Sequence, residues 1–240
     1  MGYSFNKFLL CIFKLIIFST ILTFSYNFQA FSDDNKKIVY LTFDDGPSKN
    51  TELILNILKE NDVHATFFII SPYIEPHIKF VQRAYEEGNA IGNHTADHEF
   101  EHIYTSEDAF FKSFNKQQEF IKDTTGSCCT IFRFPGGSHN TLVRNARGKD
   151  FTANITKKLN EQGISVYDWN VDSGDAKGNN IPASVLINNV SKNLKDKDGN
   201  YKNPAIILMH DCMTKNTTVE ALPGIIKLLK DEGYTFEILK

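Results

Sequence analysis

The chain has 240 residues, of which 41% are hydrophobic and 12% aromatic. That is enough apolar material for one well-packed domain, and it matches the size of a single α/β barrel. The formal net charge is −3, so the chain lacks the broad basic surface of a nucleic-acid-binding protein.

Residues 1–30 are predicted to be a targeting segment. Positions 8–31 are almost wholly apolar apart from Lys14, and positions 15–24 resemble the core of a signal peptide. Cleavage after Ala30 would leave the large Phe28 where a small residue is favoured, so an uncleaved membrane anchor is the alternative. Either way we predict an exported protein, secreted or anchored facing the cell wall, with its domain over residues 36–240.

The four cysteines are predicted to be unpaired. Cys11 lies in the targeting segment, Cys128 and Cys129 precede a predicted strand, and Cys212 follows another. In a parallel sheet those positions fall at opposite strand ends, farther apart than the roughly 7 Å that a disulfide spans.

Apolar runs and helical periodicity alternate along the body of the chain. Strands are predicted at residues 38–43, 65–70, 90–92, 131–134, 164–167, 205–209 and 234–239, and helices at 51–59, 75–87, 106–122, 154–162, 182–194 and 219–231. Phe110, Phe111 and Phe114 form a stripe that we interpret as core packing. Alternating strands and helices predict a parallel sheet, and about seven units predict a distorted (β/α) barrel.

Two carboxylates, Asp44 and Asp45, end the first strand and are closed by Gly46 and Pro47. An unpaired buried carboxylate costs several kcal/mol, so both need partners. A metal ion is one candidate partner and an arginine is another. Arg133 ends the fourth predicted strand and is the candidate ion-pair partner of Asp44.

His94 and His98 follow the third strand, four residues apart. On one helical turn they would face the same way and could hold one ion. Two histidines and one carboxylate, with an open position, form the ligand pattern of catalytic zinc. His102 is interpreted as a surface residue. His210, at the end of another strand, is by itself equally compatible with a hydrogen-bonded core histidine.

Together these segments resemble the polysaccharide deacetylase family, the NodB-homology domain of carbohydrate esterases. The motifs are Thr-Phe-Asp-Asp-Gly at 42–46, His-Thr-Ala-Asp-His at 94–98, Arg-Phe-Pro-Gly-Gly at 133–137, Trp-Asn-Val-Asp-Ser-Gly-Asp at 169–175 and Leu-Met-His at 208–210. They occur in the family's order, and the resemblance covers residues 36–240.

The resemblance implies that Asp45, His94 and His98 hold one divalent ion, with Zn²⁺ expected and Co²⁺, Ni²⁺ or Mn²⁺ as alternatives. It also implies that Asp44 is the base for a metal-bound water and that His210 is the acid that protonates the leaving group.

Other roles follow from the same resemblance. Arg133 would keep Asp44 ionised, and Asp172 would raise the pKa of His210, with Asp175 as the next candidate. The Pro-Gly-Gly turn would hold the oxyanion by a backbone N–H. Substrate-binding positions would be Pro135, Gly136, Trp169 and Leu208.

Two positions depart from the family pattern. Gly136 stands where a tyrosine is common, and Ala176 where a tryptophan is common. The second departure removes a wall of the acetyl pocket, which Trp169 could replace. Downstream, residues 141–150 carry Arg144, Arg147 and Lys149, either as a solvated loop or as a contact for carboxylates on peptide stems of the wall polymer.

We therefore predict a metal-dependent hydrolase that removes acetyl groups from a cell-wall glycan, with N-acetylglucosamine of peptidoglycan as the expected substrate. Chitin oligosaccharides and acetylated xylan are alternative substrates, and a non-catalytic glycan-binding wall protein is an alternative of another class. We expect a monomer whose partner is the wall glycan.

Overall fold

The computed structural model describes residues 36–71 and 77–240, and Lys37–Lys240 form one compact unit. The targeting segment predicted over residues 1–30 lies outside the described residues, as does Cys11. Among the residues that are described, no helix has the length and apolar character needed to cross a membrane.

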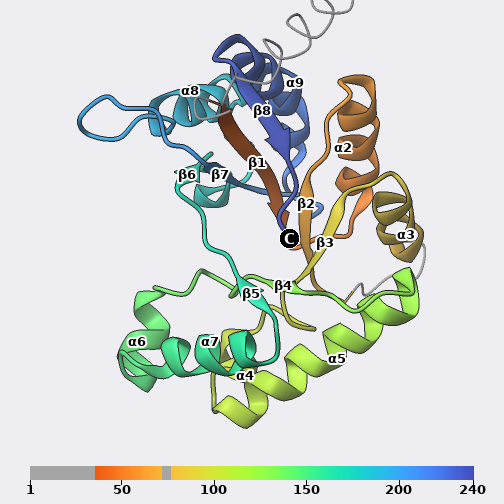
Figure 1. The fold of residues 1–240 in the computed structure, drawn as a ribbon, viewed down its shortest axis with the longest axis vertical. Coiled ribbons are helices and arrows are strands. Elements are labelled where there is room, and N and C mark those ends of the chain that lie inside the picture. Colours follow the sequence, from red (N-terminus) through yellow and green to blue (C-terminus); the bar gives the residue numbers. More distant parts are fainter. Residues whose placement is uncertain (1–35, 72–76) are drawn as a thin grey trace, which may run out of the picture. The chain divides into compact units, whose positions relative to one another are not determined.

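The strands form one curled, wholly parallel sheet (Figure 1). In chain order they are β1 (Lys37–Asp44), β2 (Thr66–Ile69), β3 (Ala90–Asn93), β4 (Ile131–Phe132), β5 (Ser165–Val166), β6 (Val171–Asp172), β7 (Ala205–His210) and β8 (Tyr234–Glu237). The order across the sheet is β5-β4-β3-β2-β1-β7-β6, and β8 pairs with the first half of β1. The predicted distorted barrel is confirmed, but it is open, because no pairing joins β5 to β6 among the described residues.

Helices connect most successive strands, as the sequence predicts, whereas β5 and β6 are joined by the loop 167–170. They are α2 (Lys49–Glu60), α3 (Ile78–Glu86), α4 (Phe100–Ile103), α5 (Glu107–Thr125), α6 (Thr141–Arg147), α7 (Phe151–Glu161), α8 (Ala183–Asn193) and α9 (Asn216–Asp231), with a 3₁₀ turn η2 (Asp175–Lys177). The seven predicted strands and six predicted helices are present, although residues 75–76 of the helix predicted at 75–87 lie outside the described residues. Sequence periodicity missed β6, α4 and α6, which are too short to show a repeat.

Two apolar cores support the sheet. The larger one packs β1, β2 and β7 against α2, α8 and α9. The smaller one is rich in phenylalanine: Phe110 and Phe114 of α5 pack on Phe132 and Phe134, whose rings meet edge to face at 4.9 Å. The predicted phenylalanine stripe is therefore core, and Phe111 lies partly buried against it.

The parallel arrangement brings the carboxyl ends of all strands to one edge. In the register of the sheet, Asp44 of β1 lies beside Phe68 of β2 and His210 of β7. Neighbouring strands are about 4.8 Å apart. Loops that are far apart in sequence therefore meet at this edge, as in other barrels.

Candidate active site

Asp44, the last residue of β1, is buried against Arg133. Nη1 of Arg133 donates to Oδ1 of Asp44 at 2.9 Å and to Oγ1 of Thr42 at 2.7 Å. Nε of Arg133 donates to the carbonyl oxygen of Tyr167 at 3.0 Å. The guanidinium is wholly buried, and a buried ion pair is stable only when its remaining donors are also bonded, as they are here. The predicted partner of Asp44 is confirmed.

Asp45 points between two imidazole rings. Its Oδ1 lies 3.5 Å from Nε2 of His94 and 3.6 Å from Nε2 of His98, and Oδ1 has no hydrogen-bond partner in the described part of the chain. Asp45 takes a left-handed backbone conformation, φ 72°, which aspartate tolerates better than most residues. Its N–H donates to the carbonyl oxygen of Phe68, so the end of β2 holds this conformation.

The helical turn expected for residues 94–98 is wrong. His94 follows β3 directly, and residues 94–98 form an irregular turn before α4 begins at Phe100. Thr95 has a φ of 66°, which is strained for a β-branched residue. Its hydroxyl donates to the carbonyl oxygen of Asp97, and its N–H donates to Oδ1 of Asn93. This side-chain bonding, rather than helical periodicity, turns both imidazoles toward Asp45. His102 is exposed, as predicted.

Asp45 and His98 have the protonation states that a divalent ion requires. Burial favours neutral Asp45, but the neighbouring histidines outweigh burial and hold its pKa well below the usual range. Burial lowers the pKa of His98, which keeps that ring neutral. The carbonyl oxygen of Arg133 lies 2.7 Å from Nδ1 of His94, so a proton on Nδ1 leaves the Nε2 lone pair directed at Asp45. Ligating atoms of Asp45, His94 and His98 all lie within 4.8 Å of one another. Oδ1 of Asp45, which has no hydrogen-bond partner among the described residues, and Nε2 of both histidines are therefore a suitable set of ligands for a metal ion.

His210 is bonded to Asp175, not to Asp172, which corrects the prediction. Nδ1 of the His210 ring lies 2.8 Å from Oδ1 of Asp175, and the backbone N–H of His210 donates to Oδ2 of the same carboxylate at 2.8 Å. The reason is the left-handed turn at Gly174, φ 78°, which returns the chain toward β7 after Asp172. Oδ1 of Asp172 instead accepts a hydrogen bond from the N–H of Gly174.

The electrostatics of His210 follow from that bond. Burial disfavours the imidazolium, but Asp175 outweighs burial and raises the pKa of His210 to about 9. Oδ2 of Asp175 also accepts from the hydroxyl of Thr218 at 2.8 Å. Asp175 is itself almost wholly buried, so the pair is a well-bonded, desolvated unit of the kind that shifts pKa values strongly.

Asp211 was not singled out from the sequence, yet it fixes the loop that carries Asp44 and Asp45. Its N–H donates to the carbonyl oxygen of Asp44, and its carbonyl oxygen accepts from the hydroxyl of Ser48, the N-cap of α2. Its carboxylate accepts from Thr51 and lies directly against Gly46, where a Cβ would fall 2.2 Å from Oδ2. Burial raises the pKa of Asp211 to about 7. Its place directly after His210, where β7 ends, is the signal in the sequence that could have found it.

Two of the predicted substrate-binding positions, Pro135 and Gly136, form the Pro-Gly-Gly turn, and a third, Trp169, lies against it. The carbonyl oxygen of Pro135 accepts from the hydroxyl of Tyr104 at 2.9 Å. Trp169 is half-buried, with its ring 3.0 Å from where a Cβ on Gly137 would lie. Leu208 is buried in β7, two residues before His210 and so on the same face of the strand.

Phe100 occupies the space beside Gly136. A Cβ on Gly136 would lie 2.7 Å from Cζ of Phe100, and the centroid of the Phe100 ring is 5.4 Å from that of His98. An aromatic ring therefore stands next to the turn although position 136 has no side chain, and it comes from α4, which sequence periodicity did not reveal.

The described cysteines, Cys128, Cys129 and Cys212, are unpaired, as predicted.

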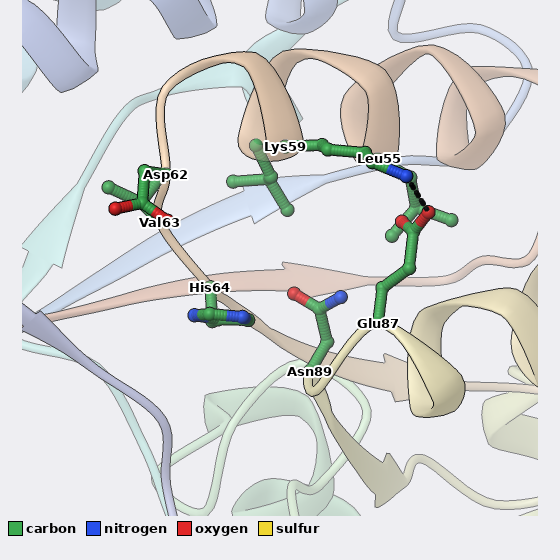
Figure 2. Close-up of a pocket in the computed structure, with 8 residues that line it drawn as sticks. Leu55, Lys59, Asp62, Val63, His64, Glu87 and Asn89 are labelled. Carbon is green, nitrogen blue, oxygen red and sulfur yellow. Dashed lines mark hydrogen bonds and ion pairs between the residues drawn. The ribbon is translucent and has the colours of Figure 1, made fainter.

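A separate pocket lies at the opposite edge of the sheet, between the end of α2 and the residues that precede β2 and β3 (Figure 2). Lys59 and Glu87 form an ion pair at 3.4 Å across it, and it contains none of the predicted site residues.

Fold and site together define a (β/α) barrel enzyme with its polar groups gathered at the carboxyl ends of the strands. The chain belongs to the polysaccharide deacetylase family, a family of hydrolases: the family model for polysaccharide deacetylase matches residues 31–165.

Similar proteins agree with this assignment. The chain is 33% identical to a peptidoglycan-N-acetylglucosamine deacetylase of Bacillus cereus, over 87% of this chain and 71% of the relative. Among solved structures, it resembles the catalytic domain of peptidoglycan N-acetylglucosamine deacetylase from Eubacterium rectale, with TM-score 0.78 and 34% identity over 86% of this chain and 90% of that one. It also resembles a CE4 esterase of Streptococcus mutans, with TM-score 0.73 and 32% identity over 86% and 87% of the two chains.

Proposed function

We propose that this protein removes acetyl groups from N-acetylglucosamine of peptidoglycan, with Asp44 as general base and His210 as general acid. The observation that carries the proposal is the register of β1 and β7, which places Asp44 and His210 side by side at the mouth of the barrel. Each is held by its own partner, Arg133 for Asp44 and Asp175 for His210. Relatives named as peptidoglycan deacetylases support the choice of substrate.

Asp45, His94 and His98 would hold one divalent ion, and two imidazoles with one carboxylate favour Zn²⁺ over the harder cations. Such an ion, when bound, polarises a carbonyl group and lowers the pKa of a bound water to about 7. Co²⁺, Ni²⁺ and Mn²⁺ are the alternatives.

The residues of the chain have separate tasks in this proposal. Arg133 occupies Oδ1 of Asp44, so Oδ2 is the atom that takes a proton from the attacking water. A backbone N–H of the Pro-Gly-Gly turn, at Gly136, stabilises the oxyanion of the tetrahedral intermediate. Because Nδ1 of His210 faces Asp175, His210 donates its proton from Nε2 to the leaving amine nitrogen, which releases acetate and the free amine.

The substrate implies where the protein acts. Peptidoglycan lies outside the cytoplasmic membrane, so we propose that the domain acts on the cell-wall side, secreted or anchored through its N-terminal segment, as a monomer. Fractionation of cells that express the full chain tests this placement, since activity confined to the cytoplasm would contradict it.

Acetate release from a panel of glycans tests the function. The purified protein is incubated with peptidoglycan, chitin oligosaccharides and acetylated xylan, after chelation and again after Zn²⁺ is restored, with the Asp44→Asn variant as the matched control. We expect metal-dependent acetate release from peptidoglycan by the wild type alone. Release from xylan only would indicate an O-deacetylase, and wall binding without any release would indicate the non-catalytic alternative.

A further inference from the structure

A pocket of about 580 Å³ lies beside the candidate active site, between the turn that follows β4 and the helices α6 and α7. These two helices lie at the lower left in Figure 1. The pocket is lined by residues of both helices and of the connecting loop, among them Ser138, His139, Arg144, Lys149, Asp150 and Thr152.

The pocket is tied to the active site through Ser138. Ser138 is two residues from Gly136, so their Cα atoms lie no more than about 7 Å apart. The N–H and the hydroxyl of Ser138 both donate to the carboxylate of Asp168. The carbonyl oxygen of Asp168 in turn accepts from Nη2 of Arg133 at 3.3 Å. A ligand group in this pocket would therefore sit close to the turn proposed to hold the oxyanion.

The hydroxyl groups of the lining are already engaged. Ser138 donates to Asp168, Thr152 donates to the carbonyl oxygen of Ser138 at 2.8 Å, and Thr156 donates to the carbonyl oxygen of Thr152 at 2.8 Å. The hydrogen-bond donors left for a ligand are thus the cationic ones, Arg144 and Lys149, together with the ring of His139.

The two cations are unpaired, which distinguishes them from their neighbour Arg147. Nε of Arg147 donates to the carbonyl oxygen of Tyr104 at 2.6 Å, so that side chain supports the fold. Arg144 and Lys149 are exposed, and neither forms an ion pair with an acidic group in the described residues. Asp150 is the single acidic residue of the lining, so the lining has a net charge of +1 with His139 neutral.

We propose that this pocket is an anion subsite that binds a carboxylate carried by the glycan substrate, next to the acetyl group that is removed. The proposal rests on the proposed function and adds to it a preference for an acidic, peptide-substituted glycan over a neutral one. A planar guanidinium matches a carboxylate by two parallel hydrogen bonds, and the ammonium of Lys149 adds a second positive charge.

The test compares three substrates that differ only in charge or in substituent. They are a peptidoglycan fragment with its peptide carboxylates free, the same fragment with those carboxylates converted to amides, and a neutral chitin oligosaccharide. The proteins are the wild type, Arg144→Ala, Lys149→Ala and Arg144→Glu. Lys197→Ala is the matched control, because Lys197 is an exposed lysine in the turn that precedes β7.

Exposed ion pairs are modest and screened by salt. We therefore expect each alanine variant to raise KM for the free-carboxylate fragment about two- to fivefold, and Arg144→Glu to raise it further, with kcat little changed. KM for the amidated fragment and for the chitin oligosaccharide should be the same in the variants as in the wild type. For the wild type, KM should be lower for the free-carboxylate fragment than for the amidated one, and 0.5 M salt should abolish this difference.

Two results separate this proposal from the function on which it rests. Equal KM values of the wild type for the free and amidated fragments, or an equal effect of the variants on both, would overturn the anion subsite and leave the deacetylase intact. Absence of acetate release by the wild type from all three substrates would instead overturn the proposed function.

Discussion

The two sides of the candidate active site are built differently. On the side of β1 and β7, the carboxyl groups of Asp44, Asp175 and Asp211 are all buried, and each is bonded to a neighbour. On the side of the turns that follow β3 and β4, His94 and Arg133 are still buried, but the groups beyond them are not: the side chain of His98 is 39% exposed, and Arg144 and Lys149 are exposed and unpaired.

This difference indicates which side of the site suits acid–base chemistry and which side suits recognition of the substrate. Buried charges interact strongly because little water screens them, and they must be paired to be tolerated. They therefore hold a fixed geometry, which acid–base chemistry requires. Exposed cations have weak, adaptable interactions, which suits the recognition of a variable polymer.

The largest effect is expected from loss of a metal ligand. Asp45→Ala or His94→Ala should abolish metal binding, because two remaining ligands bind an ion far more weakly than three. His102→Ala is the control, since His102 is an exposed histidine of the adjacent helix. Metal content of the purified variants is the measurement, and a full equivalent of ion in either variant would remove that residue from the ligand set.

Asp44→Asn should leave the metal in place and lower the rate constant by roughly 10²–10⁴, the usual contribution of a positioned acid or base. Asparagine keeps the shape but not the basicity of the side chain, and its amide oxygen can still accept from Arg133. Acetate release and metal content are measured on one preparation, with thermal unfolding to show that the variant is folded. A near-native rate at neutral pH would show that Asp44 is not the base.

The pH profile should separate Asp175 from Asp172. His210 donates a proton only as imidazolium, so activity should fall as pH rises through its pKa. Asp175 raises that pKa to about 9, and a cation held by Asp45 would offset part of the shift. We therefore expect the falling limb between the ordinary value of about 6.5 and about 9.

Asp175→Asn removes the charge that stabilises the imidazolium, so the falling limb should move to lower pH while the acidic limb stays in place. Asp172→Asn is the matched control and should move neither limb, because Oδ1 of Asp172 bonds the N–H of Gly174. The measurement is kcat/KM against pH. A limb that moves in Asp172→Asn and stays in Asp175→Asn would reverse the assignment.

The smallest effect concerns the support beneath the two carboxylates. Gly46→Ala would place a Cβ 2.2 Å from Oδ2 of Asp211, so the loop or Asp211 must shift, at a cost of about 1–3 kcal/mol in the free energy of unfolding. Gly178→Ala is the control, because its Cβ would meet only an ordinary contact at 3.9 Å with Ile181. Chemical denaturation measures the free energy of unfolding of both variants. Equal values would show that the loop accommodates the added Cβ without cost.

Most of the architecture could be predicted from local pattern. Buried strands such as 38–43 and 205–209 are runs of apolar residues, and long helices such as 106–122 show a full apolar stripe. Short elements could not be predicted in this way. β6 has two residues and α4 has four, and they are stabilised by neighbours that a local pattern does not contain.

The sequence by itself determined the fold class, the grouping of Asp45 with His94 and His98, and the pairing of Arg133 with Asp44. All of these residues except His98 end or directly follow a strand of a parallel sheet, and His98 lies in the turn that begins at His94, so one topological rule brings them together. Only the tertiary structure decided that Asp175 rather than Asp172 meets His210, and that Asp211 supports the loop at Gly46. Those contacts depend on a left-handed turn at Gly174 and on packing across β1 and β7, and backbone reversals and cross-strand packing leave no periodic signal in the chain.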